Sequence, residues 1–271
     1  MSRARILIVA AGTVIILVVV GLAWVLWPRG TTEVSEQDAL ADFRKSVGTS
    51  TSVPSPDQNG STRGGPGEVP PPGVYTYRAD GQEEVKLGPL PTETRPLPDT
   101  ATAVVVDHGN GCFEWTINLF AEHTEDTRYC ADPSGSLTLA GHTTHQRLGA
   151  LSPTATSDCD PNVLIEPGTR SSTLNCDMSM EGGPAAITAT LVGTATGGDT
   201  EQLTIGDEQV AVTPLTISYE VTGDLSGTWN ETLWLRNDHL PVRVERELDL
   251  SGPATFTERS RLELVDLSPS T

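Results

Sequence analysis

The sequence His142-Thr143-Thr144-His145 is the closest approach to a metal-binding pair in this chain. On a helix, two imidazoles at this spacing could share a face and ligate one ion. The surrounding residues 136–148 are rich in threonine and leucine, which favours a strand. On a strand, a spacing of three places the two side chains on opposite faces. We therefore expect exposed or hydrogen-bonded histidines and no bound metal.

The segment Asp158-Cys159-Asp160-Pro161-Asn162 alternates oxygen-bearing side chains like the first half of a calcium loop. It lacks the glycine at the sixth position and the glutamate at the twelfth that complete such a loop. Aspartate, proline and asparagine are also frequent turn formers, so the prediction is a surface turn.

Motifs for nucleophilic catalysis are missing from the sequence. In Gly223-Asp224-Leu225-Ser226-Gly227 the serine stands one place too late for Gly-x-Ser-x-Gly, and no Ser-x-x-Lys occurs. Carboxylate pairs such as Glu83-Glu84 and Glu245 with Glu247 are expected by chance in so acidic a chain. We predict a protein without catalytic activity and without a cofactor.

The four cysteines indicate disulfide bonds in an oxidising compartment. Their number is even, and no two of them form a Cys-x-x-Cys motif, which argues against a zinc or redox site. The cysteines are Cys112, Cys130, Cys159 and Cys176. Three pairings are possible in principle.

Strand register favours one of these pairings. If the strand that begins at Cys112 turns near Ala121 and returns to Cys130, the two cysteines lie directly opposite each other, and Phe113 lies opposite Tyr129. We therefore predict a Cys112–Cys130 disulfide and, by elimination, a Cys159–Cys176 disulfide.

The amino-terminal run from Ile6 to Trp27 predicts a membrane-spanning helix. Its 22 residues would reach about 33 Å, enough to cross a hydrocarbon core of about 30 Å. Arg3 and Arg5 precede the run and place residues 1–5 in the cytoplasm as a short stub. The run is longer than the apolar region of a cleaved signal peptide, so an uncleaved signal anchor is favoured over cleavage.

The part of the chain beyond this helix is strongly acidic. All 36 acidic residues follow residue 29, against 14 of the 17 basic ones, a net charge of −22. Nucleic acid is therefore excluded as an expected partner, because binding it requires a basic surface. The expected location is the cell membrane of a bacterium, with a single pass and an extracytoplasmic carboxyl-terminal domain.

Residues 28–48 form a juxtamembrane segment with one short helix, predicted from Ser35 to Val47. Ser35 is a good N-cap, and Leu40 and Phe43 fall with Val47 on one face. This narrow apolar stripe leaves three placements open: docked on the following domain, docked on the membrane surface, or standing free. Residues 49–72 are dominated by serine, threonine, glycine and proline, which predicts a disordered tether.

Residues 73–271 read as one exported β domain. Apolar and polar residues alternate with a period of two in several segments, as at Ile217, Tyr219 and Val221. Between Leu240 and Leu250 the even positions are apolar, with Arg246 as the one exception. The predicted fold is mainly β: an antiparallel meander that forms a curved sheet or an open half-barrel.

Two sequence features carry a family resemblance. The strand bearing Trp229, Leu233 and Leu235 leads through a polar turn into Leu240-Pro241-Val242-Arg243. This hairpin resembles the last hairpin of uncharacterised exported β-sheet proteins and of the lipoprotein-carrier half-barrel family. The segments Pro70-Pro71-Pro72-Gly73-Val74-Tyr75-Thr76-Tyr77 and Gly111-Cys112-Phe113-Glu114-Trp115 are similar to single-pass, membrane-anchored exported proteins of actinobacteria. The carrier resemblance implies a curved sheet whose concave face holds a lipid or an acyl chain.

The leading functional hypothesis is a binding protein for an apolar or amphipathic envelope ligand, such as a lipid, or for an envelope protein. The candidate binding residues are Trp229, Leu233, Tyr219 and Val244. A scaffold with a filled core is one alternative, and a hydrolase with a site near His142 or His145 is another. An apolar cavity above roughly a few hundred cubic ångströms would favour ligand binding.

Overall fold

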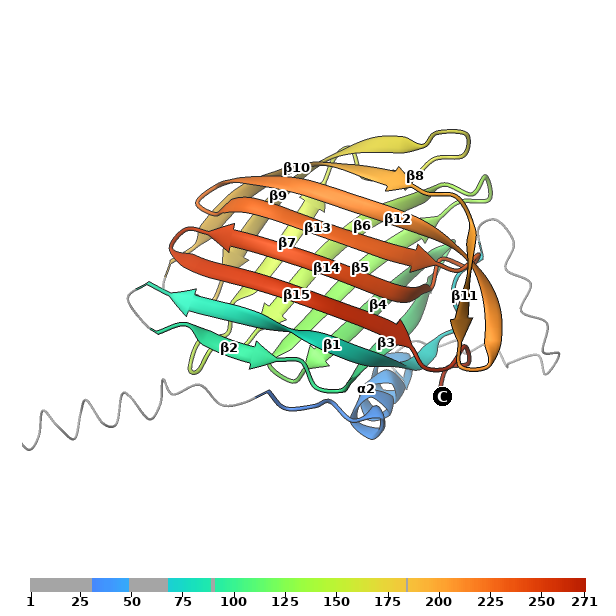
Figure 1. Cartoon of the computed structure of the whole chain (residues 1–271), viewed down its shortest axis with the longest axis horizontal. Coiled ribbons are helices and arrows are strands. Elements are labelled where there is room, and N and C mark those ends of the chain that lie inside the picture. Colours follow the sequence, from blue (N-terminus) through green and yellow to red (C-terminus); the bar gives the residue numbers. More distant parts are fainter. Residues whose placement is uncertain (1–30, 49–67, 89–90, 184) are drawn as a thin grey trace, which may run out of the picture.

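Twelve antiparallel strands close into a β-barrel with one short helix on its outer surface (Figure 1). The computed structural model describes residues 31–48, 68–88, 91–183 and 185–271. The wall strands are β1 (Gly73–Leu87), β3 (Thr100–Gly109), β4 (Cys112–Phe120), β5 (His123–Ala131), β6 (Leu137–Gln146), β7 (Thr154–Cys159), β9 (Ser171–Glu181), β10 (Ile187–Gly197), β12 (Glu208–Gly223), β13 (Ser226–Leu235), β14 (Pro241–Ser251) and β15 (Ala254–Leu264).

Three shorter strands extend this wall. β2 (Glu93–Pro96) pairs with β1, β8 (Val163–Ile165) pairs with β6, and β11 (Glu201–Ile205) pairs with β12. Around the barrel the strands follow the order β10, β9, β7, β6, β5, β4, β3, β1, β15, β14, β13, β12. Most neighbours are consecutive in the chain, so the predicted antiparallel meander is confirmed.

The prediction of an open half-barrel is wrong, because β10 pairs with β12 and closes the wall. This ladder runs from Ala189 opposite Gly223 to Gly197 opposite Leu215. Strand twist carries the two ends of a long sheet toward each other, and pairing them satisfies backbone groups that an open edge would leave exposed. The barrel therefore encloses its core instead of offering an open concave face.

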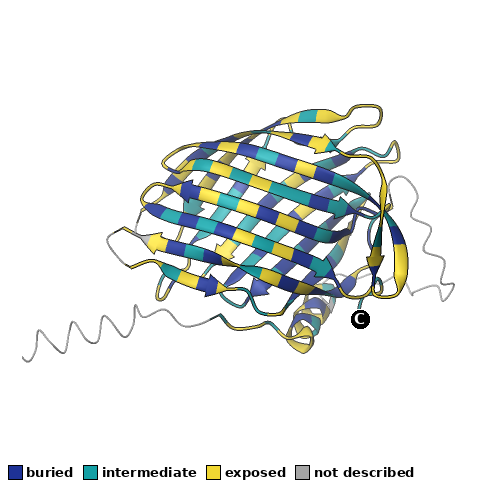
Figure 2. Cartoon of the chain, in the orientation of Figure 1, coloured by how far each residue is buried: buried dark blue, intermediate teal, exposed yellow. Residues whose placement is uncertain are grey.

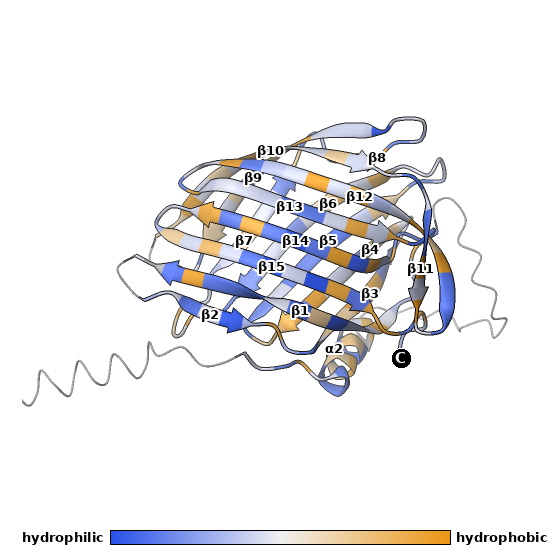
Figure 3. Ribbon diagram, viewed as in Figure 1, coloured by the Kyte–Doolittle hydropathy of each residue, from blue (hydrophilic) through white to orange (hydrophobic). Residues whose placement is uncertain are grey.

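Alternation along the strands separates the interior from the exterior. β4 buries Phe113, Trp115, Ile117 and Leu119 at every second position, and β12 does the same with Ile217 and its neighbours. Figures 2 and 3 show this banding of buried with exposed residues, and of hydrophobic with hydrophilic ones, along the strands. The predicted faces at residues 217–221 and 240–250 are thus confirmed, and both point into the barrel.

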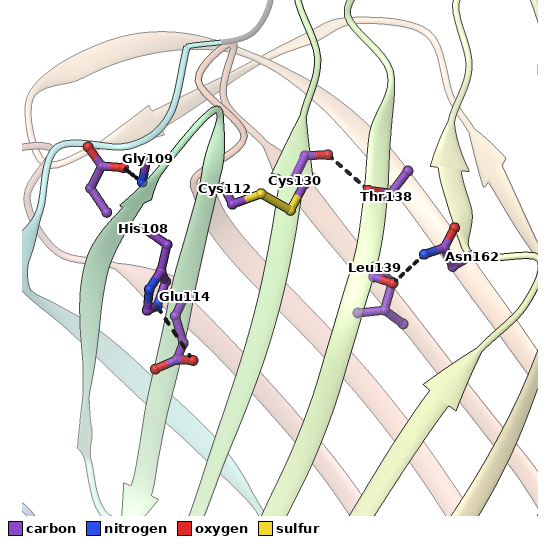
Figure 4. The surroundings of a disulfide bond; sticks show 9 residues. His108, Gly109, Cys112, Glu114, Cys130, Thr138, Leu139 and Asn162 are labelled. Carbon is purple, nitrogen blue, oxygen red and sulfur yellow. Dashed lines mark hydrogen bonds and ion pairs between the residues drawn. A yellow bond between two sulfur atoms is a disulfide. The ribbon is translucent and has the colours of Figure 1, made fainter.

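Both predicted disulfides are present. Cys112 lies opposite Cys130 on the paired strands β4 and β5, and Phe113 lies opposite Tyr129, as the register predicts (Figure 4). Cys159 on β7 likewise lies opposite Cys176 on β9. Each disulfide therefore joins two neighbouring strands of the wall.

The short helix α2 (Glu36–Gly48) packs on the outside of the barrel. Ser35 caps it, since the Asp38 amide donates to Ser35 Oγ at 3.2 Å. On its apolar face Ala39 and Phe43 are buried against the outward side chains Val74 and Val104 of β1 and β3. Of the three predicted placements, the structure shows docking on the domain.

The predicted membrane helix 6–27 lies outside the described residues, as do the stub 1–5 and most of the predicted tether 49–72. Within the ranges described, no helix has both the length and the apolar content needed to cross a bilayer. Residues 68–72 of the predicted tether are described, and Pro70 is buried.

A substitution at the closing seam tests the barrel. Gly193 of β10 faces Tyr219 of β12, and a Cβ at this position would come within 2.4 Å of Ser218 O and 2.5 Å of the Tyr219 ring. We expect Gly193→Val to lower the free energy of unfolding by about 1–3 kcal/mol, because overpacking forces the seam apart. Urea unfolding measures this. The control Val192→Thr changes an exposed neighbour, and equal stability of the two variants would contradict closure at this seam.

Candidate functional site

A network of buried charges crosses the interior of the barrel. Its centre is Arg246 on β14, whose Nη1 donates to Glu125 Oε1 at 2.7 Å and whose Nη2 donates to Glu231 Oε1 at 2.8 Å. Glu258 Oε1 lies 3.5 Å from the same guanidinium. These three carboxylates come from β5, β13 and β15, so one arginine connects four strands.

His123 extends the network toward β1 and β2. Its Nδ1 lies 2.7 Å from Glu83 Oε2, and its Nε2 lies 3.0 Å from Glu125 Oε1. Arg95 of β2 pairs with Glu83 and donates to the carbonyl of Arg147. We call this set the buried charge network: Glu83, Arg95, His123, Glu125, Glu231, Arg246 and Glu258.

Charges within the network, together with burial, shift the pKa values of its members. Burial would lower the pKa of His123, but Glu83 and Glu125 raise it to about 10. Burial would raise the pKa of Glu125, but Arg246 and His123 hold it well below its usual range. The pKa of Glu258 stays raised, because burial outweighs the attraction of Arg246.

A pocket opens at one end of the barrel, above this network. We call it the mouth pocket; its volume is about 80 Å³. Its walls are apolar and its floor is polar. The wall residues are Pro153, Ala155, Met178, Met180, Leu191, Val221, Leu225, Trp229, Leu248, Leu250 and Phe256, and the remaining lining residues are His123, Glu125, Thr144, Gln146, Arg246 and Glu258.

Several polar atoms of this lining lack hydrogen-bond partners in the described part of the chain. They are Glu125 Oε2, Gln146 Oε1 and Trp229 Nε1, all buried from solvent. A buried polar atom without a partner costs roughly 1–3 kcal/mol.

Two of the four predicted binding residues line this region. Trp229 borders the mouth pocket and a second, deeper cavity of about 30 Å³, which Tyr219 also lines. The two rings lie 5.9 Å apart, opposite each other on β12 and β13. The predicted face at Tyr219 and Trp229 is therefore next to the pockets.

The other two predicted binding residues belong to the packed core. Leu233 and Val244 lie opposite each other on β13 and β14, and both are fully buried. Neither lines the mouth pocket or the deeper cavity. The buried pair of Glu231 and Arg246 separates these two residues from Tyr219 and Trp229 on the inner face of the barrel.

His142 and His145 lie on opposite faces of β6, as the strand spacing predicts. His142 is buried, and its ring nitrogens contact the hydroxyls of Thr127 at 3.0 Å and Thr144 at 3.1 Å. His145 is exposed and pairs with Asp126 at 3.0 Å. The two imidazoles therefore cannot form one site.

The calcium-like segment forms a turn between β7 and β8. The side-chain amide of Asn162 donates to the carbonyl of Leu139 (Figure 4), and Cys159 is committed to its disulfide. Both contacts indicate a structural role for this segment.

One metal-compatible group does occur among the described residues. Ligand atoms of Glu83, His123 and Glu258 lie within 4.8 Å of one another, and all three residues are buried. Both ring nitrogens of His123 already face carboxylates, and Glu83 already pairs with Arg95. A cation here would have to displace these ion pairs, so the charge network accounts for the group.

Sequence reasoning missed the buried charge network, although one signal for it was visible. Arg246 interrupts an otherwise apolar inward face, and a buried arginine requires carboxylate partners. In the sequence, Glu83 resembles ordinary surface acidity, and His123 belongs to no recognisable motif. These residues become neighbours of one another only in the closed barrel, where β1, β5 and β14 surround one interior.

No protein family, curated protein or solved structure matches this chain. The functional assignment must therefore come from the geometry of the mouth pocket and of the charges beneath it.

Removal of the central arginine tests the network. We expect Arg246→Met to lower the free energy of unfolding by about 3–5 kcal/mol, because it leaves buried carboxylates without their cation. The matched control is Arg259→Met, since the ion pair of Arg259 with Glu247 is exposed and contributes less than about 1 kcal/mol. Chemical denaturation compares the two, and similar losses would contradict the network.

The raised pKa of His123 makes stability depend on pH. The unfolded pKa is about 6.5, and folding raises the pKa of His123 to about 10. Its contribution is therefore fully present below about pH 6.5 and is lost as the pH rises toward 10, at up to about 1.4 kcal/mol per pH unit. Urea unfolding across this range measures the slope, and His123→Gln should flatten it. An unchanged slope in the variant would contradict this assignment.

Proposed function

We propose that this protein is a membrane-anchored, extracytoplasmic binding protein, and that it takes one end of a small amphipathic molecule into the mouth pocket. The observation that carries the proposal is the apolar wall of this pocket above a floor with unpartnered polar atoms. Apolar pockets with a few convergent polar groups are the usual form of small-molecule sites. No catalytic step is required of the site.

The mouth pocket is smaller than the few hundred cubic ångströms typical of small-molecule sites, and its size limits what can enter. A volume of about 80 Å³ accommodates about five to eight water-sized groups. This is enough for a polar head and a few methylene groups, but not for a whole lipid. The rest of a longer ligand would extend out of the mouth.

The floor of the pocket favours a head group that donates hydrogen bonds. Glu125 Oε2 and Gln146 Oε1 are acceptors without partners, and the Glu258 carboxyl group lies beside them in the lining. An amine or an alcohol would donate hydrogen bonds to these acceptors, whereas a carboxylate has no hydrogen to donate to them. An alkyl amine combines this head with an apolar body that suits the walls.

The proposed location rests on the apolar run 6–27 and on the two disulfides, which suit an oxidising compartment. A scaffold role is the second candidate, favoured by the small cavity volumes and by a core that is otherwise filled with aromatic and aliphatic side chains. A hydrolase site near His142 or His145 has less support, because their opposite orientation separates them.

Short alkyl ligands test the binding proposal. We expect butylamine to bind the full chain in lipid nanodiscs more tightly than butan-1-ol, and butyrate to bind weakest, as measured by isothermal titration calorimetry against empty nanodiscs. Equal binding heats for butylamine and butyrate would contradict the proposal that the floor of the pocket offers hydrogen-bond acceptors.

Two variants separate binding from stability. Leu248→Trp fills the pocket and should abolish amine binding. Gln146→Leu removes an unpartnered acceptor, so it should weaken amine binding without loss of folding stability. Val192→Thr, on the exposed face of β10, is the matched control. Unchanged binding in Leu248→Trp would favour the scaffold role.

A further inference from the structure

The first described residues are attached to the rim of the barrel at the end where the mouth pocket opens. Thr31 donates from its hydroxyl to the carbonyl of Pro96 at 3.1 Å. The backbone amide of Thr32 donates to Glu122 Oε2 at 3.0 Å, and its carbonyl accepts from the amide of Ala121 at 2.8 Å. Residues 31 and 32 thus connect β2 to the turn between β4 and β5.

This rim surrounds the mouth pocket. The turn at Ala121 and Glu122 precedes His123, which lines the pocket. The loops between β6 and β7, between β12 and β13, and between β14 and β15 lie at the same end, because successive hairpin turns of an antiparallel meander alternate between the two ends. Pro153, Leu225 and Leu250 place these loops beside the pocket.

The predicted membrane helix ends very close to this rim in the sequence. Only residues 28–30 separate Trp27 from Thr31. Four residues of extended chain span at most about 14 Å. Because residues 31–48 are attached to the barrel, the length of the segment 49–67 does not set the distance between barrel and membrane.

The two ends of the barrel also differ in charge. Among the described residues, we define the mouth loops as 88, 91–92, 97–99, 121–122, 147–153, 182–183, 185–186, 224–225 and 252–253, and the distal loops as 110–111, 132–136, 160–162, 166–170, 198–200, 206–207, 236–240 and 265–271. The mouth loops carry three carboxylates and one arginine: Asp99, Glu122, Asp224 and Arg147. The distal loops carry seven carboxylates and two arginines: Asp132, Asp160, Glu166, Asp199, Asp207, Asp238, Asp266, Arg170 and Arg236.

We infer that the mouth of the barrel faces the surface of the bilayer that holds residues 6–27. This rests on the proposed membrane anchor and deepens the proposed function, because a pocket that opens toward the bilayer can take the head of an amphipathic molecule directly from the membrane. The partner surface is the lipid bilayer itself. The low charge of the mouth loops suits this position, whereas the distal loops would be repelled by anionic lipids.

Fluorescence energy transfer to the membrane tests the orientation. The full chain carries a donor dye on Ala150→Cys in a mouth loop, or on Thr169→Cys in a distal loop, in phosphatidylcholine vesicles that contain a headgroup-labelled acceptor lipid. Both positions are exposed. They are separated by about 25–30 Å along the barrel axis, since β9 spans 11 residues of tilted strand.

We expect several-fold higher transfer from Ala150→Cys than from Thr169→Cys. Equal transfer, or higher transfer from Thr169→Cys, would overturn the orientation. Glu122→Ala removes both side-chain hydrogen bonds to Thr32, and it should reduce the difference between the two labels. An undiminished difference would overturn the role of the Thr32 contacts.

The test of orientation can be distinguished from the test of ligand binding. Equal transfer combined with intact butylamine binding refutes the orientation alone. Failure of the chain to float with vesicles, together with intact butylamine binding, refutes the membrane anchor and therefore this inference, but leaves the pocket assignment in place.

Discussion

The ion pairs of Arg246 are the interaction on which the interior of the barrel depends. A guanidinium enclosed by protein is tolerated only when carboxylates surround it, and here those carboxylates come from three other strands. Every one of these strands must keep its register, because a shift of one residue would turn its glutamate to the outer face. The network therefore links the alignment of β5, β13, β14 and β15 to one central charge.

The same network divides the barrel into two parts. On the distal side, Trp115, Tyr77 and Phe113 fill the interior together with aliphatic side chains. On the mouth side the lining is apolar but incompletely filled, and its floor keeps acceptors without partners. The mouth pocket, at about 80 Å³, is thus larger than the deeper cavity of about 30 Å³ beside Trp115.

Local patterns in the sequence predicted the local structure well. The register around Cys112 and Cys130, the N-cap at Ser35 and the inward face at Ile217 follow from short-range rules of strand and helix geometry, and the structure has all of them. Closure of the barrel could not be predicted from these short-range rules, because it depends on whether β10 meets β12 after the accumulated twist of the whole sheet. The partners of Arg246 did not follow either, since they become neighbours only once the barrel is closed.

The contrast between the two ends of the barrel follows from where its charges are placed. Backbone pairing alone would leave the ends equivalent, because each consists of hairpin turns. The distal loops carry most of the loop carboxylates, while the carboxylates beneath the mouth pocket lie inside the barrel, paired with Arg95, His123 and Arg246. An interior carboxylate can accept a hydrogen bond from a donor that enters the pocket. Its charge is cancelled, as seen from outside the barrel, by the cation with which it is paired. The mouth loops therefore suit the position beside a bilayer that we propose, and the unpaired acceptors beneath them suit the amine or hydroxyl head group that we propose as the ligand.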